Sequence, residues 1–267
     1  MKRIFGYISL AFIFFILILV WTLKIDNSLG YSEFVSGGAL FFIISFLFLF
    51  NIRKRLPFLP LWPAHKWFLL HTIMGFLALL LFWLHAGSLW PKGLYVQILA
   101  SLFYLTTLSG IVGLIMEKIY PNLLTRIGHE CIYERIPHDI AKIRKKSEKL
   151  ILECTEKTGS DTLAKHYLET LGWFFQRPRF FINNIFGGRD SHNWINQQCA
   201  ILERFLNEAE REYMKQIFTL AEIKRKIDHH YSLQTMLKSW LLIHIPLAAG
   251  AMVMAVWHLI VIQVYFN

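Results

Sequence analysis

Two stretches decide the fold of this chain: LLHTIMGFLALLLFWLHAGSLW, residues 69–90, and KSWLLIHIPLAAGAMVMAVWHLIVI, residues 238–262. Each is long enough to cross the hydrocarbon core of a bilayer, for which an α-helix needs about 20 mostly apolar residues. Neither contains an acidic residue or an arginine, and Lys238 at the start of the second stretch is their one lysine. Both stretches therefore predict membrane-spanning helices, and each carries two histidines inside its apolar run.

The composition of the whole chain agrees with a membrane protein. Of the 267 residues, 55% are apolar and 17% are charged, a balance that is wrong for a soluble domain. The expected spans are Ile4–Leu23, Phe34–Phe50, Trp67–Trp90, Leu94–Met116 and Leu237–Phe266. The first has the basic start of a signal peptide, but no small-residue cleavage site follows it, so we interpret it as a span. The sequence predicts an all-α integral membrane protein with five transmembrane helices.

Residues 118–234 have a different character, because they contain 19 of the 28 Lys and Arg and 15 of the 18 Asp and Glu. We expect a helical insert between spans four and five, with helices at Asp139–Lys157 and Asp161–Phe175. A third helix begins at Asp190 or Ser191, either of which could cap it, and could continue unbroken into the fifth span. The expected domains are membrane helices one to four (1–117), the insert (118–234) and the fifth membrane helix (235–267).

Short loops predict the orientation, because cytoplasmic loops carry an excess of Lys and Arg. The loop 51–66 carries four basic residues and no acidic one, and Lys2 and Arg3 stand at the amino terminus. We therefore expect a multi-pass protein of the inner (cytoplasmic) membrane. Its amino terminus, this loop and the cytoplasmic helical insert 118–234 would face the cytoplasm, and its carboxy terminus would lie outside.

Charge and cysteine content argue against several classes of function. The net charge of +10 does not indicate nucleic-acid binding, because the basic residues cluster beside long apolar runs. The three cysteines, Cys131, Cys154 and Cys199, form no C-x-x-C or C-x-x-C-H motif. The sequence therefore offers neither an iron–sulfur cassette nor a covalent c-type haem.

Four of the eleven histidines lie well inside expected spans, where ionisable groups are costly and indicate function. His71 and His85 in span three are fourteen residues apart, and so are His244 and His258 in span five. Each residue of an α-helix turns the chain by about 100°, so fourteen residues end about 40° short of four full turns and each pair lies on one face of its helix. The two histidines of a pair are then about 21 Å apart along the helix axis. Because both spans run outward, His71 is expected level with His244, and His85 level with His258.

Two facing helices with this pattern offer two sites with two imidazoles each. Haem iron has axial positions on its two faces, and two imidazoles can fill both, which suits electron transfer over oxygen chemistry. We therefore expect two haem b groups, with His71, His85, His244 and His258 as the cofactor-binding and iron-ligating residues and no catalytic residue. A single buried histidine could instead bond a backbone carbonyl. Zinc or copper is another alternative, although pairs about 21 Å apart cannot bring four histidines to one ion.

The two stretches resemble those of the bis-haem cytochrome b group, which includes ferric-reductase-like membrane domains and related bacterial respiratory cytochrome b subunits. The resemblance rests on H-x13-H in both stretches and covers spans three to five. It implies electron transfer through two haems b. Many ferric-reductase-like proteins carry a flavin and nicotinamide domain at the carboxy end, but this chain stops after its fifth span and has no GxGxxG loop. We therefore expect a partner subunit or quinone to supply or accept electrons.

The leading hypothesis is a di-haem cytochrome b membrane subunit, the electron-transfer part of an oxidoreductase complex in a respiratory chain. It would relay electrons across the membrane or between a redox partner and quinone. The expected partners are iron–sulfur, multihaem or flavoprotein subunits. Two alternatives are a transmembrane ferric or other metal reductase fed by a separate flavoprotein, and a non-redox membrane anchor of a complex.

Overall fold

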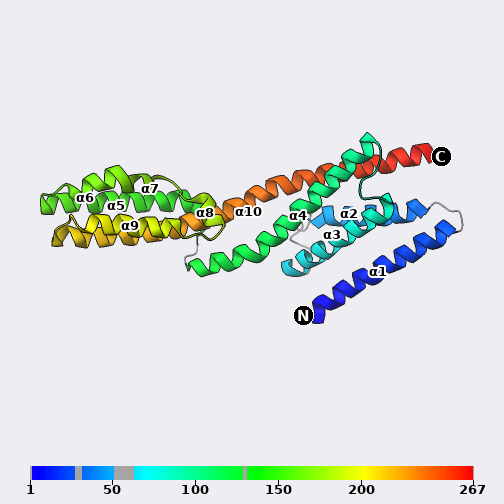
Figure 1. Ribbon diagram of the computed structural model, residues 1–267, viewed down its shortest axis with the longest axis horizontal. Coiled ribbons are helices and arrows are strands. Elements are labelled where there is room, and N and C mark those ends of the chain that lie inside the picture. The colour runs from blue at the N-terminus through cyan, green and yellow to red at the C-terminus, as the bar shows by residue number, and fades with distance from the viewer. Residues whose placement is uncertain (1, 28–31, 51–62, 129–130, 267) are drawn as a thin grey trace. The chain divides into compact units, whose positions relative to one another are not determined.

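Every regular element in the described part of this computed structural model is a helix (Figure 1). The structure describes residues 2–27, 32–50, 63–128 and 131–266. Within these ranges five helices are long and apolar enough to cross a membrane. They are α1 (Lys2–Asn27), α2 (Ser32–Leu49), α3 (Ala64–Ala86), α4 (Leu94–Ile127) and α10 (Glu208–Phe266). The predicted all-α, multi-pass membrane fold is confirmed, whereas the basic residues 53–55 that support the orientation lie outside the described ranges.

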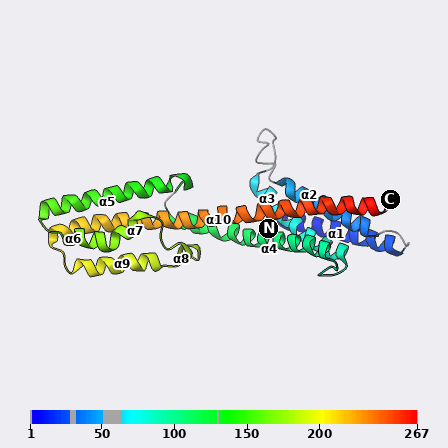
Figure 2. The same ribbon diagram turned by 90° about the horizontal axis from the view of Figure 1, so that it is seen from above.

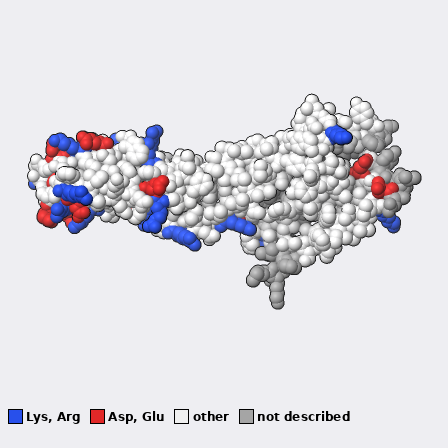
Figure 3. Space-filling view, viewed as in Figure 1, with Lys and Arg blue, Asp and Glu red and all other residues white. Residues whose placement is uncertain are grey.

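The chain divides into two compact units. The membrane unit comprises Met1–Ile115 and Trp240–Asn267, and the polar unit comprises Met116–Ser239. α4 and α10 each contribute residues to both units, so that only the part of α10 from Trp240 onward belongs to the membrane unit. On the face seen in Figure 3, charged side chains gather over the polar unit, whereas the surface of the membrane unit is largely uncharged.

The membrane unit is built from helices that run back and forth, as Figures 1 and 2 show for α1 to α4. α2 packs on α3, and α1 packs on both. The core of these helices consists of apolar side chains, namely Ile18, Leu40, Ile43, Leu77, Ala78, Leu81, Phe82, Ala100 and Phe103. Other large apolar side chains point outward; Phe42 is 70% exposed and Leu242 is 77% exposed. Such an apolar exterior is what a surrounding of lipid requires, because no backbone or polar group can bond water there.

The third span ends earlier than the sequence predicts, at Ala86 instead of Trp90. Gly87 stops the helix because it adopts the left-handed conformation, with φ of 62°, and its amide donates to the carbonyl of Trp83. Trp90 lies in the connection to α4, where its ring stacks on that of Tyr104. Aromatic residues of this kind are typical of the membrane–water interface.

The polar unit is a bundle of amphipathic helices. In α5 (Ile136–Thr158) the buried residues recur every three or four positions, at Ile136, Ile140, Ile143, Ser147, Ile151 and Cys154. This face packs in a common core with apolar residues of the other helices, among them Leu171, Phe174 and Ile217. The remaining elements are η2 (Tyr133–Arg135), α6 (Thr162–His166), the π-helical turn η3 (Tyr167–Leu171), α7 (Gly172–Gln176), α8 (Phe181–Ile185) and α9 (Asp190–Glu203).

The third predicted helix of the insert does not continue into the fifth span, because α9 and α10 are separate helices. Asn207 and Glu210 cap the start of α10 reciprocally: the Glu210 amide donates to Asn207 Oδ1 at 2.9 Å, and the Asn207 amide donates to Glu210 Oε2 at 3.0 Å. The predicted cap of α9 is also wrong. Asp190 and Ser191 both lie inside this helix, and Asn183 Oδ1 accepts the Asp190 amide at 3.2 Å.

A buried ion pair ties the polar part of α10 to the segment between α7 and α8. Lys224 Nζ contacts Asp228 Oδ2, and the two side chains are 0% and 1% exposed. Lys224 also donates to the Arg177 carbonyl at 2.9 Å, and Asp228 accepts the Arg179 amide at 3.2 Å. Burial lowers the pKa of Lys224 and raises that of Asp228, while the attraction between their charges opposes both shifts. Each charge is therefore compensated mainly by the other.

Asp228→Asn is expected to destabilise the polar unit by about 3–5 kcal/mol, because it leaves the Lys224 ammonium buried without its counter-charge. Urea unfolding of the full chain in detergent, followed by hydrogen exchange in α7 and α8, measures this loss. The matched control is Glu148→Gln, which breaks an exposed pair with Arg144 whose side chains are 49% and 41% exposed. That pair should contribute less than about 1 kcal/mol. Equal losses in the two variants would contradict the role given to the buried pair.

Candidate functional site

Two cavities in the described part of the membrane unit are each lined by one histidine of α3 and one of α10. The first has a volume of about 350 Å³ and is lined by His85 and His258. The second has a volume of about 280 Å³ and is lined by His71 and His244. Their walls are mostly apolar, and Glu33 in the first cavity is the one charged side chain among the described lining residues. Concave, mostly apolar sites with a few polar groups are typical of cofactor binding.

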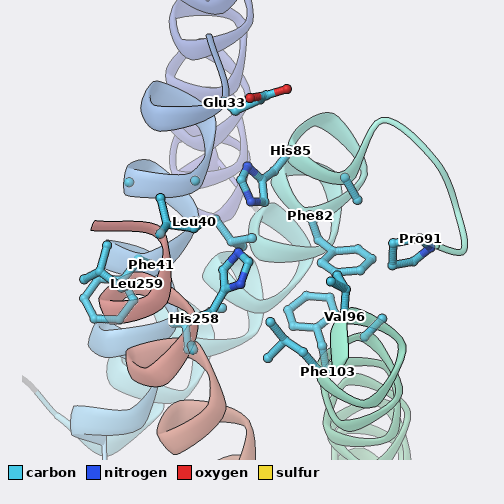
Figure 4. A pocket seen from close by; sticks show the side chains of 18 of the residues that line it. Glu33, Leu40, Phe41, Phe82, His85, Pro91, Val96, Phe103, His258 and Leu259 are labelled. Carbon is cyan, nitrogen blue, oxygen red and sulfur yellow. The ribbon is translucent and has the colours of Figure 1, made fainter. Parts of the chain in front are cut away.

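In the first cavity the two imidazoles lie opposite each other (Figure 4). Their ring centres are 6.3 Å apart and their planes are at 78°. Leu40 lies on one side of this pair, and the stacked rings of Phe82 and Phe103 lie on the other. Two imidazoles bound to opposite sides of one metal ion, through bonds of about 2.0 Å, have ring centres about 6 Å apart. The separation of His85 and His258 therefore fits a single metal centre between the two rings.

The second cavity combines His71 and His244 with two large rings. Phe50 lies against His71, with ring centres 4.6 Å apart. Trp240 stacks on His244, with ring centres 5.2 Å apart and planes at 22°. Gly75, one turn after His71, also lines this cavity, and a Cβ there would meet nothing within 4 Å. The open space beside Gly75 suits a flat group that lies against the helix.

The four histidines thus form two pairs and no larger cluster. Within the described ranges, no group of three or more His, Cys, Asp or Glu side chains could hold one metal ion. The two histidines that line each cavity come from different helices, α3 and α10. They are the histidines that the sequence predicts to lie level with each other, because both spans run outward. Each cavity offers two nitrogen ligands, which suits a cofactor that brings the remaining ligands of its metal with it, as a porphyrin does.

His85 is held by a serine and a glycine of α2. The Ser36 hydroxyl lies 3.3 Å from His85 Nδ1, and the Ser36 side chain is 1% exposed. The next residue, Gly37, lies directly against the same imidazole, since a Cβ there would come within 2.7 Å of His85 Cε1. Any larger residue at this position would displace the ring. The position of His85 therefore depends on α2 as well as on its own helix.

A serine and a glycine of α4 lie beside His244. The Ser109 hydroxyl lies 2.7 Å from His244 Nδ1, and a Cβ at Gly110 would lie 3.6 Å from His244 Cε1. The Ser109 carbonyl accepts a hydrogen bond from Trp240 Nε1 at 2.7 Å. At Gly113 a Cβ would come within 2.0 Å of the Trp240 ring. Residues 109–113 of α4 therefore contact both Trp240 and His244, the two side chains of α10 at the second cavity.

A common spacing links these contacts. In or next to each of four helices, two of the residues that belong to the histidine pairs or contact them are fourteen residues apart. These residues are Ser36 and Phe50 at α2, His71 and His85 on α3, Tyr95 and Ser109 on α4, and His244 and His258 on α10. Tyr95 completes the set by stacking on His258, with ring centres 6.0 Å apart. The sequence did not predict the supporting residues of α2 and α4, because unlike residues at this spacing carry no signal until the helices are packed together.

No family model, curated protein or solved structure matches this chain. The likeness to the cytochrome b group therefore rests on the two histidine-bearing stretches alone. The function is argued below from the geometry of the two cavities.

The two cavities share a wall. Ile44, Phe103 and Ala251 line both of them. Phe103 also stacks on Phe82, with ring centres 4.5 Å apart. Because the same side chains bound both cavities, a single layer of protein separates groups bound in them. Groups bound in the two cavities would therefore lie close to each other.

Proposed function

We propose that this chain is the membrane subunit of an electron-transfer complex and binds two haems b, one in each cavity. His85 and His258 would hold one haem, and His71 and His244 the other. The observation that carries this proposal is the pair of opposed imidazoles from α3 and α10, 6.3 Å apart in the first cavity. The second cavity supports it with the same two helices and the same kinds of residue.

The residues of the two cavities explain why such sites would favour electron transfer. Haem supplies one-electron redox chemistry when it is bound. The two imidazoles of each pair would both ligate the haem iron and would leave no position for oxygen or another small ligand. The apolar walls exclude water, and the layer formed by Ile44, Phe103 and Ala251 keeps the two sites close. These properties favour electron relay over chemistry on a substrate.

The relay runs across the membrane or between a redox partner and quinone. The two histidines on each helix, His71 and His85 on α3 and His244 and His258 on α10, are about 21 Å apart along that helix. The two sites therefore lie toward opposite sides of a hydrocarbon core about 30 Å thick. The partner would be an iron–sulfur, multihaem or flavoprotein subunit, and its docking surface would be the polar unit, which carries most of the charge.

The experiment that tests the relay uses full-length protein in sealed vesicles with ferricyanide trapped inside and an impermeant reductant outside. Wild-type vesicles, with an ionophore to balance charge, should reduce the trapped ferricyanide. Vesicles with His258→Ala, which lacks one of the two sites, should do so no faster than protein-free vesicles. If the wild type binds both haems and yet leaves the trapped ferricyanide oxidised, electrons do not cross the membrane through this chain.

We further propose that the polar unit faces the cytoplasm and that the connection between α3 and α4 lies outside, as the basic loop 51–66 indicates. Cysteines at Lys149, whose side chain is 77% exposed, and at Ser88, an exposed residue between α3 and α4, report the two sides. In intact cells an impermeant maleimide should label Ser88→Cys above the wild-type background and leave Lys149→Cys unlabelled. The reverse pattern would show that the orientation is inverted.

A further inference from the structure

The hydroxyl of Ser109 has two partners but only one proton. Its oxygen lies 2.9 Å from the Thr106 carbonyl, which can only accept, and 2.7 Å from His244 Nδ1. Both contacts are hydrogen bonds only if the hydroxyl donates to Thr106 and accepts from a protonated Nδ1. The lone pair of His244 is then on Nε2, which is the nitrogen left for a metal.

Ser36 repeats this arrangement at the first cavity. Its oxygen lies 3.3 Å from the Glu33 carbonyl and 3.4 Å from the Ser32 carbonyl, and these groups can take its proton. If the hydroxyl donates to one of these carbonyls, it accepts from a protonated His85 Nδ1 at 3.3 Å, and the Glu33 backbone is a further partner of the same imidazole. One histidine of each pair is thus bound by a serine of a neighbouring helix, more tightly at the second cavity than at the first.

Bonds from serine and threonine hydroxyls to carbonyls of their own helix are common and carry no function by themselves. Ser101, one of several such residues on α4, bonds the Gln97 carbonyl at 2.7 Å. Ser36 and Ser109 differ because each has a histidine as a second partner and is followed by a glycine beside the same imidazole. By contrast, the buried Nδ1 of His71 has no hydrogen-bond partner among the residues that the structure describes. The serine contact is therefore specific to one ligand of each pair.

We propose that Ser109 and Ser36 are positioning residues that fix the Nδ1–H tautomer of His244 and His85 and lower the reduction potential of the haem that each histidine ligates. The inference rests on the proposed function and adds residues to it. A hydrogen bond from Nδ1–H makes an imidazole more basic, and a more basic ligand stabilises ferric over ferrous iron. The two haems then differ in potential partly because the two serine contacts differ in length.

Ser109→Ala removes the shorter contact without adding bulk. Loss of such an outer hydrogen bond typically changes metal binding by about 10–100-fold. We expect the ferrous-to-ferric ratio of one haem, at a fixed solution potential, to rise by about tenfold, which for one electron is a shift of about 59 mV. Ser36→Ala should shift the other haem in the same direction by less, because its contact is longer. Optical redox titration of the full chain resolves the two haems.

Two further variants separate positioning from general structural damage. Ser109→Thr keeps the hydroxyl and should restore the wild-type potential. Ser101→Ala removes a helix-internal bond of the same kind from α4 and should leave both potentials unchanged. The electron paramagnetic resonance spectrum of the ferric haem reports the axial ligand field. Among Ser109→Ala, Ser109→Thr and Ser101→Ala, this spectrum should change only in Ser109→Ala.

The outcomes distinguish the inference from the function on which it rests. A wild-type chain that binds no haem overturns both. If two haems are present and Ser109→Ala has the same potentials and resonance spectrum as Ser101→Ala, the positioning role is wrong and the proposed function stands. If Ser109→Ala shifts the potential and Ser109→Thr does not restore the wild-type potential, the positioning role is also contradicted, because the hydroxyl would then not be the cause of the shift.

Discussion

Replacing His71 or His244 by alanine is expected to remove one haem, and replacing His85 or His258 is expected to remove the other. Each variant would lose one of the two histidines proposed to hold its haem, so the cofactor would bind to the remaining histidine far more weakly. Haem content should fall from two per chain to one. Optical redox titration then shows which haem remains, and the two members of a pair should leave the same one.

Double substitutions sharpen this prediction. His71→Ala with His244→Ala should cost no more haem than either change alone, whereas His71→Ala with His85→Ala should remove both. His65→Ala is the control, because His65 lies on the same helix at an exposed position and lines neither cavity. If His71→Ala and His258→Ala removed the same haem, the pairing of α3 with α10 would be wrong.

Gly113→Ala should have the second large effect, the loss of haem from the second cavity in most molecules. The added Cβ would lie within 2.0 Å of the Trp240 ring, which is fixed by its bond to the Ser109 carbonyl and by stacking on His244. Overpacking of this kind typically costs about 1–3 kcal/mol. The displaced indole would carry His244 with it, so haem content and the potential of the remaining haem measure the effect.

Gly110→Ala is the matched control on the same face of α4. Its Cβ would meet His244 Cε1 at 3.6 Å, an ordinary contact. Alanine is otherwise favoured over glycine inside a helix by about 0.5–1 kcal/mol. This variant should therefore keep both haems and be as stable as the wild type or more so. Equal haem loss in Gly110→Ala and Gly113→Ala would mean that the close contact with Trp240 does not position the site.

Much of the fold and part of the site could be predicted from the sequence, because they depend on local patterns. The long apolar runs determine the spans without knowledge of their neighbours. The fourteen-residue spacing places His71 and His85 on one face of a helix whatever packs against it. The direction of the spans then predicts which histidines share a cavity, and the structure has His85 with His258 and His71 with His244.

The supporting residues could not be identified in the same way, because their roles depend on packing between helices. Ser109 and Ser101 look alike in the sequence, and both bond their own helix, but only Ser109 meets a histidine of α10. Gly113 matters because Trp240 lies against it, and these residues are far apart along the chain. The break before α10 was missed because the Asn207 cap is a polar detail inside a nearly continuous amphipathic pattern.

The most direct test of the account is the number and spin state of haems bound to the wild-type chain. Full-length protein purified from haem-replete membranes is extracted with acid acetone, the extracted haem b is counted per polypeptide, and the ferric protein is examined by electron paramagnetic resonance. We predict two extractable haems b per chain, both low-spin, because each iron would have two histidine ligands. One haem or none per chain, or a high-spin ferric signal from an intact preparation, would contradict the two bis-histidine sites.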